Sequence, residues 1–263
     1  LASLNNVEKN LRGQIDGARR VGLIDRRRER EQALDAWIAG DSGRARFGTA
    51  IRDLDTLTAD AAAESRKNLA YNLATNSQLL SAAQRVYRLA KERQKPDAQR
   101  EPGYQERDLT FIRQGLQALD RRFDPTVEKA EWMLFLGRYL DQPADQRVAS
   151  LDGALGLTGT VDRAALARKV DGFYETTQLD EAERRLALMD ATPAQIEASK
   201  DPFLKLAVAL YDHELELENA EKERAGRSLA LRPAYMEAIT QWQKDNGAIA
   251  YPDANSTLRV TYG

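Results

Sequence analysis

The sequence predicts an all-α fold, an irregular bundle with long antiparallel helices, followed by a short C-terminal β segment. Two observations carry this prediction. Up to about residue 246 the chain is rich in alanine, leucine and charged residues, with apolar side chains at helical spacing and turns rich in glycine or proline between the helical stretches. Residues 247–263 instead alternate apolar and polar side chains, a pattern typical of a strand.

Two long helical stretches are expected to open the chain. The first covers residues 5–39 and ends at Gly40-Asp41-Ser42-Gly43. Its apolar stripe comprises Leu4, Val7, Leu11, Ile15, Leu34, Trp37 and Ile38. The second covers residues 44–93, with a bend near Asp60, and ends at Lys95-Pro96-Asp97. We expect these two stretches to form a long antiparallel pair.

Shorter helices follow, and then a final long one. Asp124-Pro125 is expected to begin a helix, because aspartate is a good N-cap and proline fits the first helical position. Further turns separate the shorter helices at Pro143, Gly156–Gly159 and Pro193. Asp201-Pro202 then opens a helix that runs to about Lys244, with a kink expected at Pro233.

Composition limits the possible functions. The 39 basic and 41 acidic residues are interspersed and leave a net charge of −2, so we expect no nucleic-acid partner. No apolar stretch approaches the roughly 18–20 residues of a membrane span, so we expect no membrane partner. Cysteine is absent and histidine occurs once, which leaves too few ligands for a zinc site of these residues. We therefore expect no metal and no cofactor.

The sequence also contains few residues in patterns typical of catalysis. His213 shares an apolar helical stripe with Leu206, Leu210 and Leu217, which favours a packed, hydrogen-bonded histidine over a general base. No Gly-x-Ser-x-Gly turn occurs, and the glycines of residues 152–159 lack the spacing and the lysine of a phosphate loop. The many carboxylates form no specific acid/base pair. We therefore assign no catalytic residue to this chain.

The two ends of the chain carry the more distinctive residues. Asn5, Asn6 and Asn10 are followed by Gly13 and Gly17, although asparagine and glycine both disfavour a helix interior. Two interpretations stand side by side. One is a frayed, asparagine-capped helix start with close helix packing at the glycines. The other is an amide array presented to a ligand.

The closing strand would be unusual as an isolated element. Its alternating apolar residues, on either side of a Pro-Asp-Ala-Asn turn, are Ile249, Tyr251, Leu258, Val260 and Tyr262. A lone strand leaves its backbone hydrogen-bonding groups unpaired. We expect either an edge that awaits a partner or a piece of a sheet whose other strands lie outside this chain.

Three segments resemble a known family. The closing "YPDANSTLRVTYG", preceded by "RPAYMEAITQWQKDNG", resembles the segment by which the helical domain of family S46 serine dipeptidyl-peptidases returns to the catalytic domain. The opening "LNNVEKNLRGQIDGARR" is similar to the Asn-x-x-Lys-Asn…Gly…Gly helix of that domain. "SKDPFLKLAVAL" is similar to its Asp-Pro helix. The resemblance covers essentially the whole chain, and only the two terminal motifs are specific.

The resemblance implies that this chain is a fragment. Residues 1–247 would be the helical cap domain, and residues 248–263 the returning strand of a chymotrypsin-like β-barrel that carries the His/Asp/Ser triad elsewhere in the polypeptide. The implied partners are peptides with a free N-terminus and that catalytic domain. The resemblance also implies a dimeric parent protein in the periplasm of Gram-negative bacteria. In that family the catalytic domain sets the residue preferred at the cleaved bond.

In the family an asparagine of the first helix helps to hold the α-amino group of the substrate. Asn6 matches that position, because Lys9 follows three residues later. Asn10 lies one turn further on the same face, and an alignment shifted by one turn would assign the role to it.

Two alternatives compete with the cap domain. A freestanding helical interaction module would also lack an active site, but its exposed C-terminal strand argues against it. A complete small enzyme acting through His213 and nearby carboxylates would depend on a single histidine in an apolar stripe.

Overall fold

The computed structural model describes residues 2–121, 123–159 and 161–248, and side chains from Asn5 onward. Within these ranges the regular structure is helical and contains no strand, which confirms the all-α prediction. The predicted β segment begins at Ala248, and its residues 249–263 lie outside the described ranges. The proposed domain boundary at residues 247/248 therefore stays a prediction.

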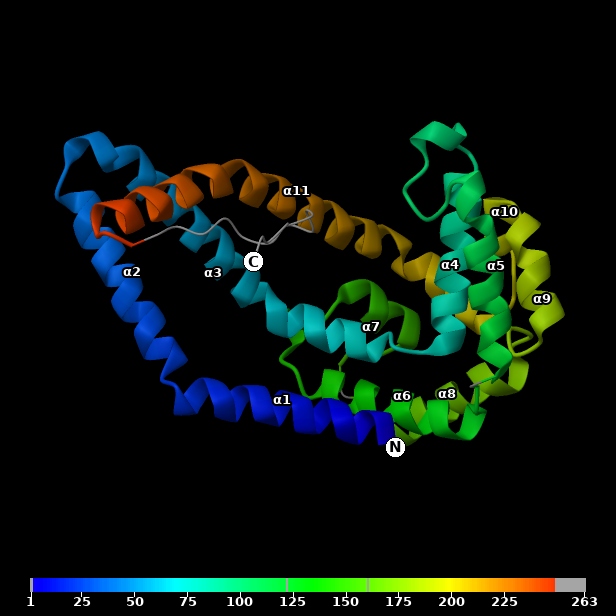
Figure 1. Cartoon of the computed structure of the whole chain (residues 1–263). Coiled ribbons are helices and arrows are strands. Elements are labelled where there is room, and N and C mark those ends of the chain that lie inside the picture. The colour runs from blue at the N-terminus through cyan, green and yellow to red at the C-terminus, as the bar shows by residue number, and fades with distance from the viewer. Residues whose placement is uncertain (1, 122, 160, 249–263) are drawn as a thin grey trace, which may run out of the picture. The chain divides into compact units, whose positions relative to one another are not determined.

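The chain folds as two compact units. The first contains the residues up to Asp60 together with those from Glu223 onward, and the second contains Ala61–Lys222. Helices α3 (Ala45–Ala74) and α11 (Pro202–Asp245) each contribute residues to both units (Figure 1).

Four α-helices and one short 3-10 helix contribute described residues to the first unit. Besides its parts of α3 and α11 it contains α1 (Ala2–Arg20), α2 (Leu23–Ala39) and the short 3-10 helix η1 (Ser42–Arg44). Its core joins α2, α3 and α11 through Leu34, Ile38, Phe47 and Ala238, with Trp37, Ile51, Tyr235, Ile239 and Trp242 packed around them. Of the residues in the predicted antiparallel pair, those of α2 and the start of α3 share this core, while α1 contributes no residue to it.

Asp245 at the end of α11 is tied to the α2–α3 turn. Its carboxylate accepts a hydrogen bond from Trp37 Nε1 at 2.9 Å and pairs with Arg44 Nη2 at 3.1 Å. The Arg44 guanidinium lies 3.9 Å from the centroid of the Trp37 ring. These contacts fix the last turn of α11 within the first unit.

The single helix predicted over residues 5–39 is wrong. The chain breaks between α1 and α2 at Gly22, whose φ of 58° and ψ of 39° are left-handed. Glycine adopts this conformation without the steric cost that a β-carbon brings. The apolar run Val21-Gly22-Leu23-Ile24 continues the helical pattern across the break, so the periodicity conceals it.

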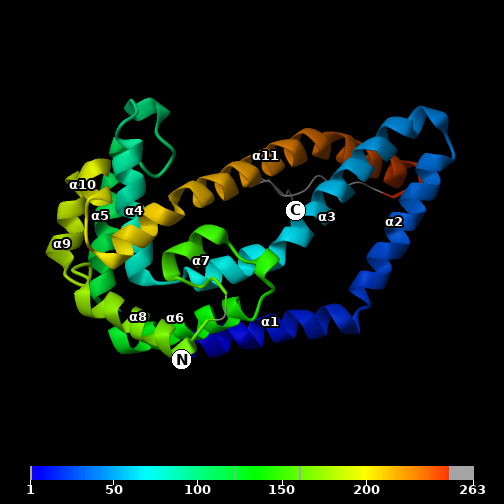
Figure 2. The same ribbon diagram turned by 180° about the vertical axis from the view of Figure 1, so that it is seen from behind.

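The second unit packs many short helices around a larger core. Between α3 and α11 its α-helices are α4 (Gln78–Glu92), α5 (Leu109–Ala118), α6 (Pro125–Leu140), α7 (Ala149–Leu155), α8 (Arg163–Thr176), α9 (Ala182–Ala187) and α10 (Pro193–Glu197). Its 3-10 helices are η2 (Asp97–Gln99), η3 (Glu106–Asp108), η4 (Leu119–Arg121), η5 (Ala144–Gln146) and η6 (Leu188–Asp190). Figure 2 shows α8, α9 and α10 from the opposite side to Figure 1.

The continuous helix predicted over residues 44–93 is also wrong. Helix α3 is uninterrupted at Asp60, and the break lies instead before Ser77, which caps α4 by accepting from Leu80 N at 3.2 Å. The buried carboxylate of Glu128 accepts from Ser77 Oγ at 2.8 Å and from Gln78 N at 3.1 Å. Helix α6, which carries Glu128, therefore stabilises the start of α4.

Other predicted boundaries are confirmed. Asp124 caps α6 by accepting from Thr126 N at 2.9 Å. Asp201 caps α11 by accepting from Phe203 N at 2.9 Å. Helix α11 then continues through Pro233 and ends at Asp245, one residue beyond the predicted end.

Candidate functional site

One face of α1 carries the candidate ligand-binding residues. Asn6, Asn10, Gly13 and Gly17 follow one another at intervals of four, three and four residues, so they share one face of the helix. All four are exposed. The structure thus brings Asn6 and Asn10 together on one surface, as the sequence predicts.

The glycines of this face are not explained by close packing. A β-carbon at Gly13 or Gly17 would meet nothing within 4 Å among the described residues. Each glycine costs roughly 1 kcal/mol of helix stability relative to alanine. Packing at the glycines therefore finds no support in the described part of the chain, and this surface of α1 is open.

The two asparagine side chains of this face differ in their contacts. Asn10 Oδ1 accepts from Gln14 Nε2 at 3.2 Å, one turn further along α1. No hydrogen bond joins the Asn6 side chain to any residue that the structure describes. A free amide oxygen accepts hydrogen bonds from an ammonium group, and the amide nitrogen donates to a carbonyl, so this side chain can bind groups of either kind.

The rest of α1 is divided into an apolar and a charged face. Val7, Leu11 and Ile15 form a stripe with half of each residue exposed, at 54%, 54% and 50%. Glu8 and Arg12 form an ion pair of 2.7 Å on the charged side. The apolar stripe that the sequence predicts is therefore present on α1, but no core of the described residues covers it.

His213 is packed in the second unit. Its ring meets the ring of Tyr71 edge-on, with 4.9 Å between the centroids. Burial lowers the pKa of His213, although the exposed Glu216 carboxylate, 3.7 Å from Nδ1, opposes this shift. Its Nε2 is buried and has no hydrogen-bond partner among the described residues, so the expected packing is present and the polar contact of the ring is the one between Nδ1 and Glu216.

Glu214 is a half-buried carboxyl beside His213. Its Oε1 accepts hydrogen bonds from the Tyr71 hydroxyl at 3.4 Å and from Gln84 Nε2. Burial raises the pKa of Glu214 to about 7, because it outweighs these two hydrogen bonds and the positive charge of Arg88, which favour the ionised form. Sequence reasoning missed this group because nothing in a charged helix distinguishes it.

We expect Glu214→Gln to stabilise the chain at alkaline pH. The folded-state pKa lies above the usual 4.5, so the neutral carboxyl stabilises the fold fully below about pH 4.5, and this contribution is lost as the pH rises through about 7. Glutamine keeps the acceptor and never ionises. Its gain over wild type should grow by about 1–3 kcal/mol between pH 5 and pH 8.

Urea unfolding at both pH values measures this gain. The comparison with wild type cancels the opposite pH dependence of His213, which both chains share. Glu216→Gln is the matched control, because the Glu216 side chain is 80% exposed and its loss should change stability little at either pH. A gain that is equal at both pH values would show that Glu214 does not titrate in this range.

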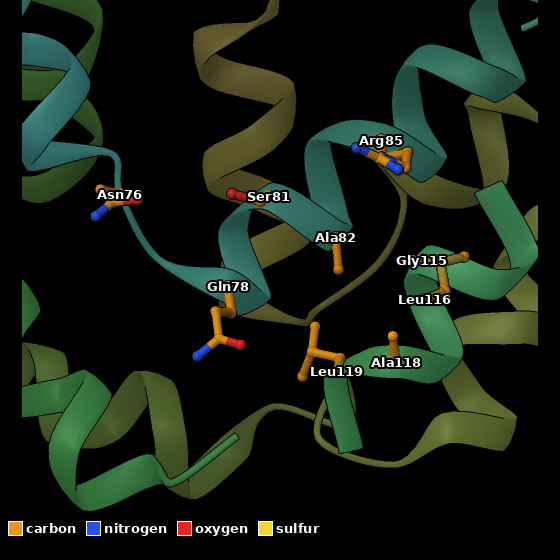
Figure 3. A pocket seen from close by; sticks show the side chains of 9 residues that line it. All are labelled: Asn76, Gln78, Ser81, Ala82, Arg85, Gly115, Leu116, Ala118 and Leu119. Carbon is orange, nitrogen blue, oxygen red and sulfur yellow. The ribbon is translucent and has the colours of Figure 1, made fainter. Parts of the chain in front are cut away.

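A cavity of about 320 Å³ lies in the second unit between α4 and the α5–η4 segment (Figure 3). Its floor is apolar and includes Ala82 and Leu116, which are buried, and Leu119. Its rim carries Gln78 and Arg85 from the same face of α4. No sequence motif marks this cavity, because it depends on how α4 and α5 pack.

The described residues offer neither a membrane span nor a metal cluster. Within the described ranges, no helix is both long and apolar enough to cross a bilayer. The same residues contain no group of three or more histidine, cysteine, aspartate or glutamate side chains placed to hold a metal ion.

The fold and the α1 surface define a helical domain with an exposed amide face. The chain belongs to the peptidase S46 family, whose model matches residues 1–263. It is 41% identical over its whole length to an Asp/Glu-specific dipeptidyl-peptidase of Shewanella putrefaciens. It is 24% identical to dipeptidyl-peptidase 7 of Capnocytophaga gingivalis, again over its whole length. The chain spans about a third, 35%, of the length of each of these relatives.

Proposed function

We propose that this chain is the helical cap and substrate-recognition domain of a serine exopeptidase that releases dipeptides from the free N-terminus of peptides. Its family membership and the names of both relatives support this class of activity. The chain corresponds to 35% of each relative, which leaves room for a catalytic domain elsewhere in the polypeptide. In this proposal the catalytic triad lies in that domain.

The observation that carries the recognition role is the open face of α1. Asn6 is exposed and shares its face with Asn10 and with two glycines that pack against nothing described. In the proposal the Asn6 carbonyl oxygen accepts a hydrogen bond from the substrate ammonium, and Asn10 lies next along the face. An acylated N-terminus has neither the charge nor the donors for this contact, so the amide selects a free end.

The proposed parent protein is a periplasmic homodimer, in keeping with the resemblance described above. A freestanding interaction module remains the alternative, and the first experiment separates the two.

We expect the isolated chain to be folded, helical and inert toward dipeptidyl arylamides, while the full-length protein hydrolyses them. The reason is that this chain contains no nucleophile motif and that its histidine is packed against Tyr71. Circular dichroism and an arylamide assay on both proteins measure this. The N-acetylated arylamide is the matched control substrate, which the full-length protein should reject.

Hydrolysis by the isolated chain that His213→Ala abolishes would contradict the proposal and favour the small-enzyme alternative. An inert full-length protein would favour the interaction module.

A further inference from the structure

Arg85 on α4 is the charged group of the cavity between α4 and the α5–η4 segment. It is exposed, and it forms no ion pair with any residue that the structure describes. Its neighbour one turn away behaves differently. Arg88 pairs with Glu92 at 2.9 Å and with Glu218 at 3.3 Å. The guanidinium of Arg85 is thus available to a ligand, while that of Arg88 is not.

The guanidinium of Arg85 lies against Gly115 of α5, where a side chain would occupy the same space. A β-carbon at Gly115 would come within 3.0 Å of Arg85 Nη1, closer than such contacts normally occur. Glycine inside a helix is unfavourable, so its presence here needs a local reason. The Nη1 atom of Arg85 lies close to α5 at this position, beside Gly115 and Leu116 of the cavity lining.

The remaining lining defines the shape of a ligand. Figure 3 shows Ala82, Ala118 and Leu119 reaching into the cavity from its two walls, with Gln78 at the far end from Arg85. The start of α4 offers no further anion site, because Ser77 and Glu128 already occupy its free backbone N–H groups. The cavity therefore combines one cation, neutral polar groups on its rim and an apolar floor.

We propose that this cavity binds a carboxylate carried on a short apolar stem. The guanidinium presents paired N–H donors that match the two oxygens of a carboxylate, and the floor accepts the hydrocarbon. The single cation fits one negative charge better than the double charge of a phosphate. Two sources supply this chemistry, the C-terminus of a peptide and an acidic side chain. The site is in the second unit and does not depend on the function proposed for α1.

Titrations of the ¹⁵N-labelled chain test the proposal. N-acetylleucine represents a C-terminus, and N-acetylglutamic acid α-amide represents an acidic side chain. We expect at least one of them to shift the Gly115 amide and Arg85 Nε–H signals with a dissociation constant of about 1–10 mM, the range for one charged contact with a small apolar group. The compound that binds more tightly shows whether the site prefers the C-terminus of a peptide or an acidic side chain. N-acetylleucinamide, which lacks the charge, should cause no such shift.

Two variants make the site falsifiable. Arg85→Gln removes an exposed charge without disturbing the core and should weaken binding about tenfold or more. Gly115→Ala favours the helix but displaces the guanidinium, and it should weaken binding several-fold. Arg113→Gln, an exposed arginine on α5 outside the cavity lining, is the matched control and should bind as wild type does.

Several results would overturn the proposal. If Arg85→Gln bound both carboxylates with wild-type affinity, the guanidinium would take no part in binding. Equal shifts with N-acetylleucinamide would show a purely apolar pocket. Inorganic phosphate that binds as tightly as the carboxylates would show general attraction of anions. A chain that binds neither carboxylate would also contradict it.

Discussion

Trp132→Ala should lower the free energy of unfolding of the second unit by about 3–5 kcal/mol, the range for removing a large buried aromatic side chain. Trp132 of α6 is fully buried, and its ring packs against Phe173 of α8 and Phe203 of α11, with centroid distances of 5.4 and 5.5 Å. Its Nε1–H also donates to Ala74 O at 2.7 Å, where α3 ends. One side chain thus joins four helices, and alanine would leave both a cavity and an unpaired carbonyl.

Urea unfolding followed by circular dichroism measures this loss without depending on the fluorescence of the removed ring. Leu134→Ala is the matched control, because Leu134 lies on the same helix and is 55% exposed. That change should stay within about 0.5 kcal/mol of wild type. A loss below about 1 kcal/mol for Trp132→Ala would mean that the core is not organised around this ring.

Asn6→Ala in the full-length enzyme should lower kcat/KM for dipeptidyl substrates by about one to two orders of magnitude. In the proposed role of Asn6, the change removes one charge-assisted hydrogen bond to the substrate ammonium, worth about 1.5–3 kcal/mol. The fold should be spared, because Asn6 is exposed and alanine is the better helix former. Steady-state kinetics on a dipeptidyl arylamide give the ratio directly.

Asn10→Ala is the matched control for the register of α1. Asn10 is equally exposed and lies on the same face, but its side chain already accepts from Gln14. If Asn6 holds the ammonium, Asn10→Ala should reduce kcat/KM much less than Asn6→Ala does. A selective loss in Asn10→Ala would place the contact one turn further along the helix.

The sequence predicts helices well where their ends have a chemical signature. Asp124 and Asp201 stand before prolines and both cap a helix, because a carboxylate next to free N–H groups needs no tertiary context. Gly22 and Ser77 show the opposite case. Gly22 interrupts an apolar pattern that continues on both sides of it, and Ser77 follows Thr75 and Asn76 in a polar run that a helix surface also tolerates. A serine N-cap was the available signal at α4, and Glu128, distant in sequence, reinforces it.

Among the candidate sites too, those formed by one helix can be predicted from the sequence, and those formed by several helices cannot. Asn6 and Asn10 lie on one helix, so their spacing alone places them on one face. The cavity beside Arg85 depends on Gly115 and Leu116, about thirty residues away on another helix, and only the packing of α4 against α5 creates it. The pKa of Glu214 is likewise raised by burial, which the tertiary packing creates and which outweighs the hydrogen bonds from Tyr71 and Gln84 on two other helices. Sequence periodicity cannot predict such groups, because it describes one helix or strand at a time.

The role of Asn6 is tested most directly by a cycle that changes the enzyme and the substrate together. Wild type and Asn6→Ala, as full-length proteins, are assayed on a dipeptidyl arylamide and on its analogue in which hydrogen replaces the α-amino group. If Asn6 binds the ammonium, the loss of about 10- to 100-fold on the ordinary substrate should shrink to near unity on the analogue, because the partner of the amide is already gone. An equal loss on both substrates would show that Asn6 acts elsewhere and would contradict its assignment to the substrate N-terminus.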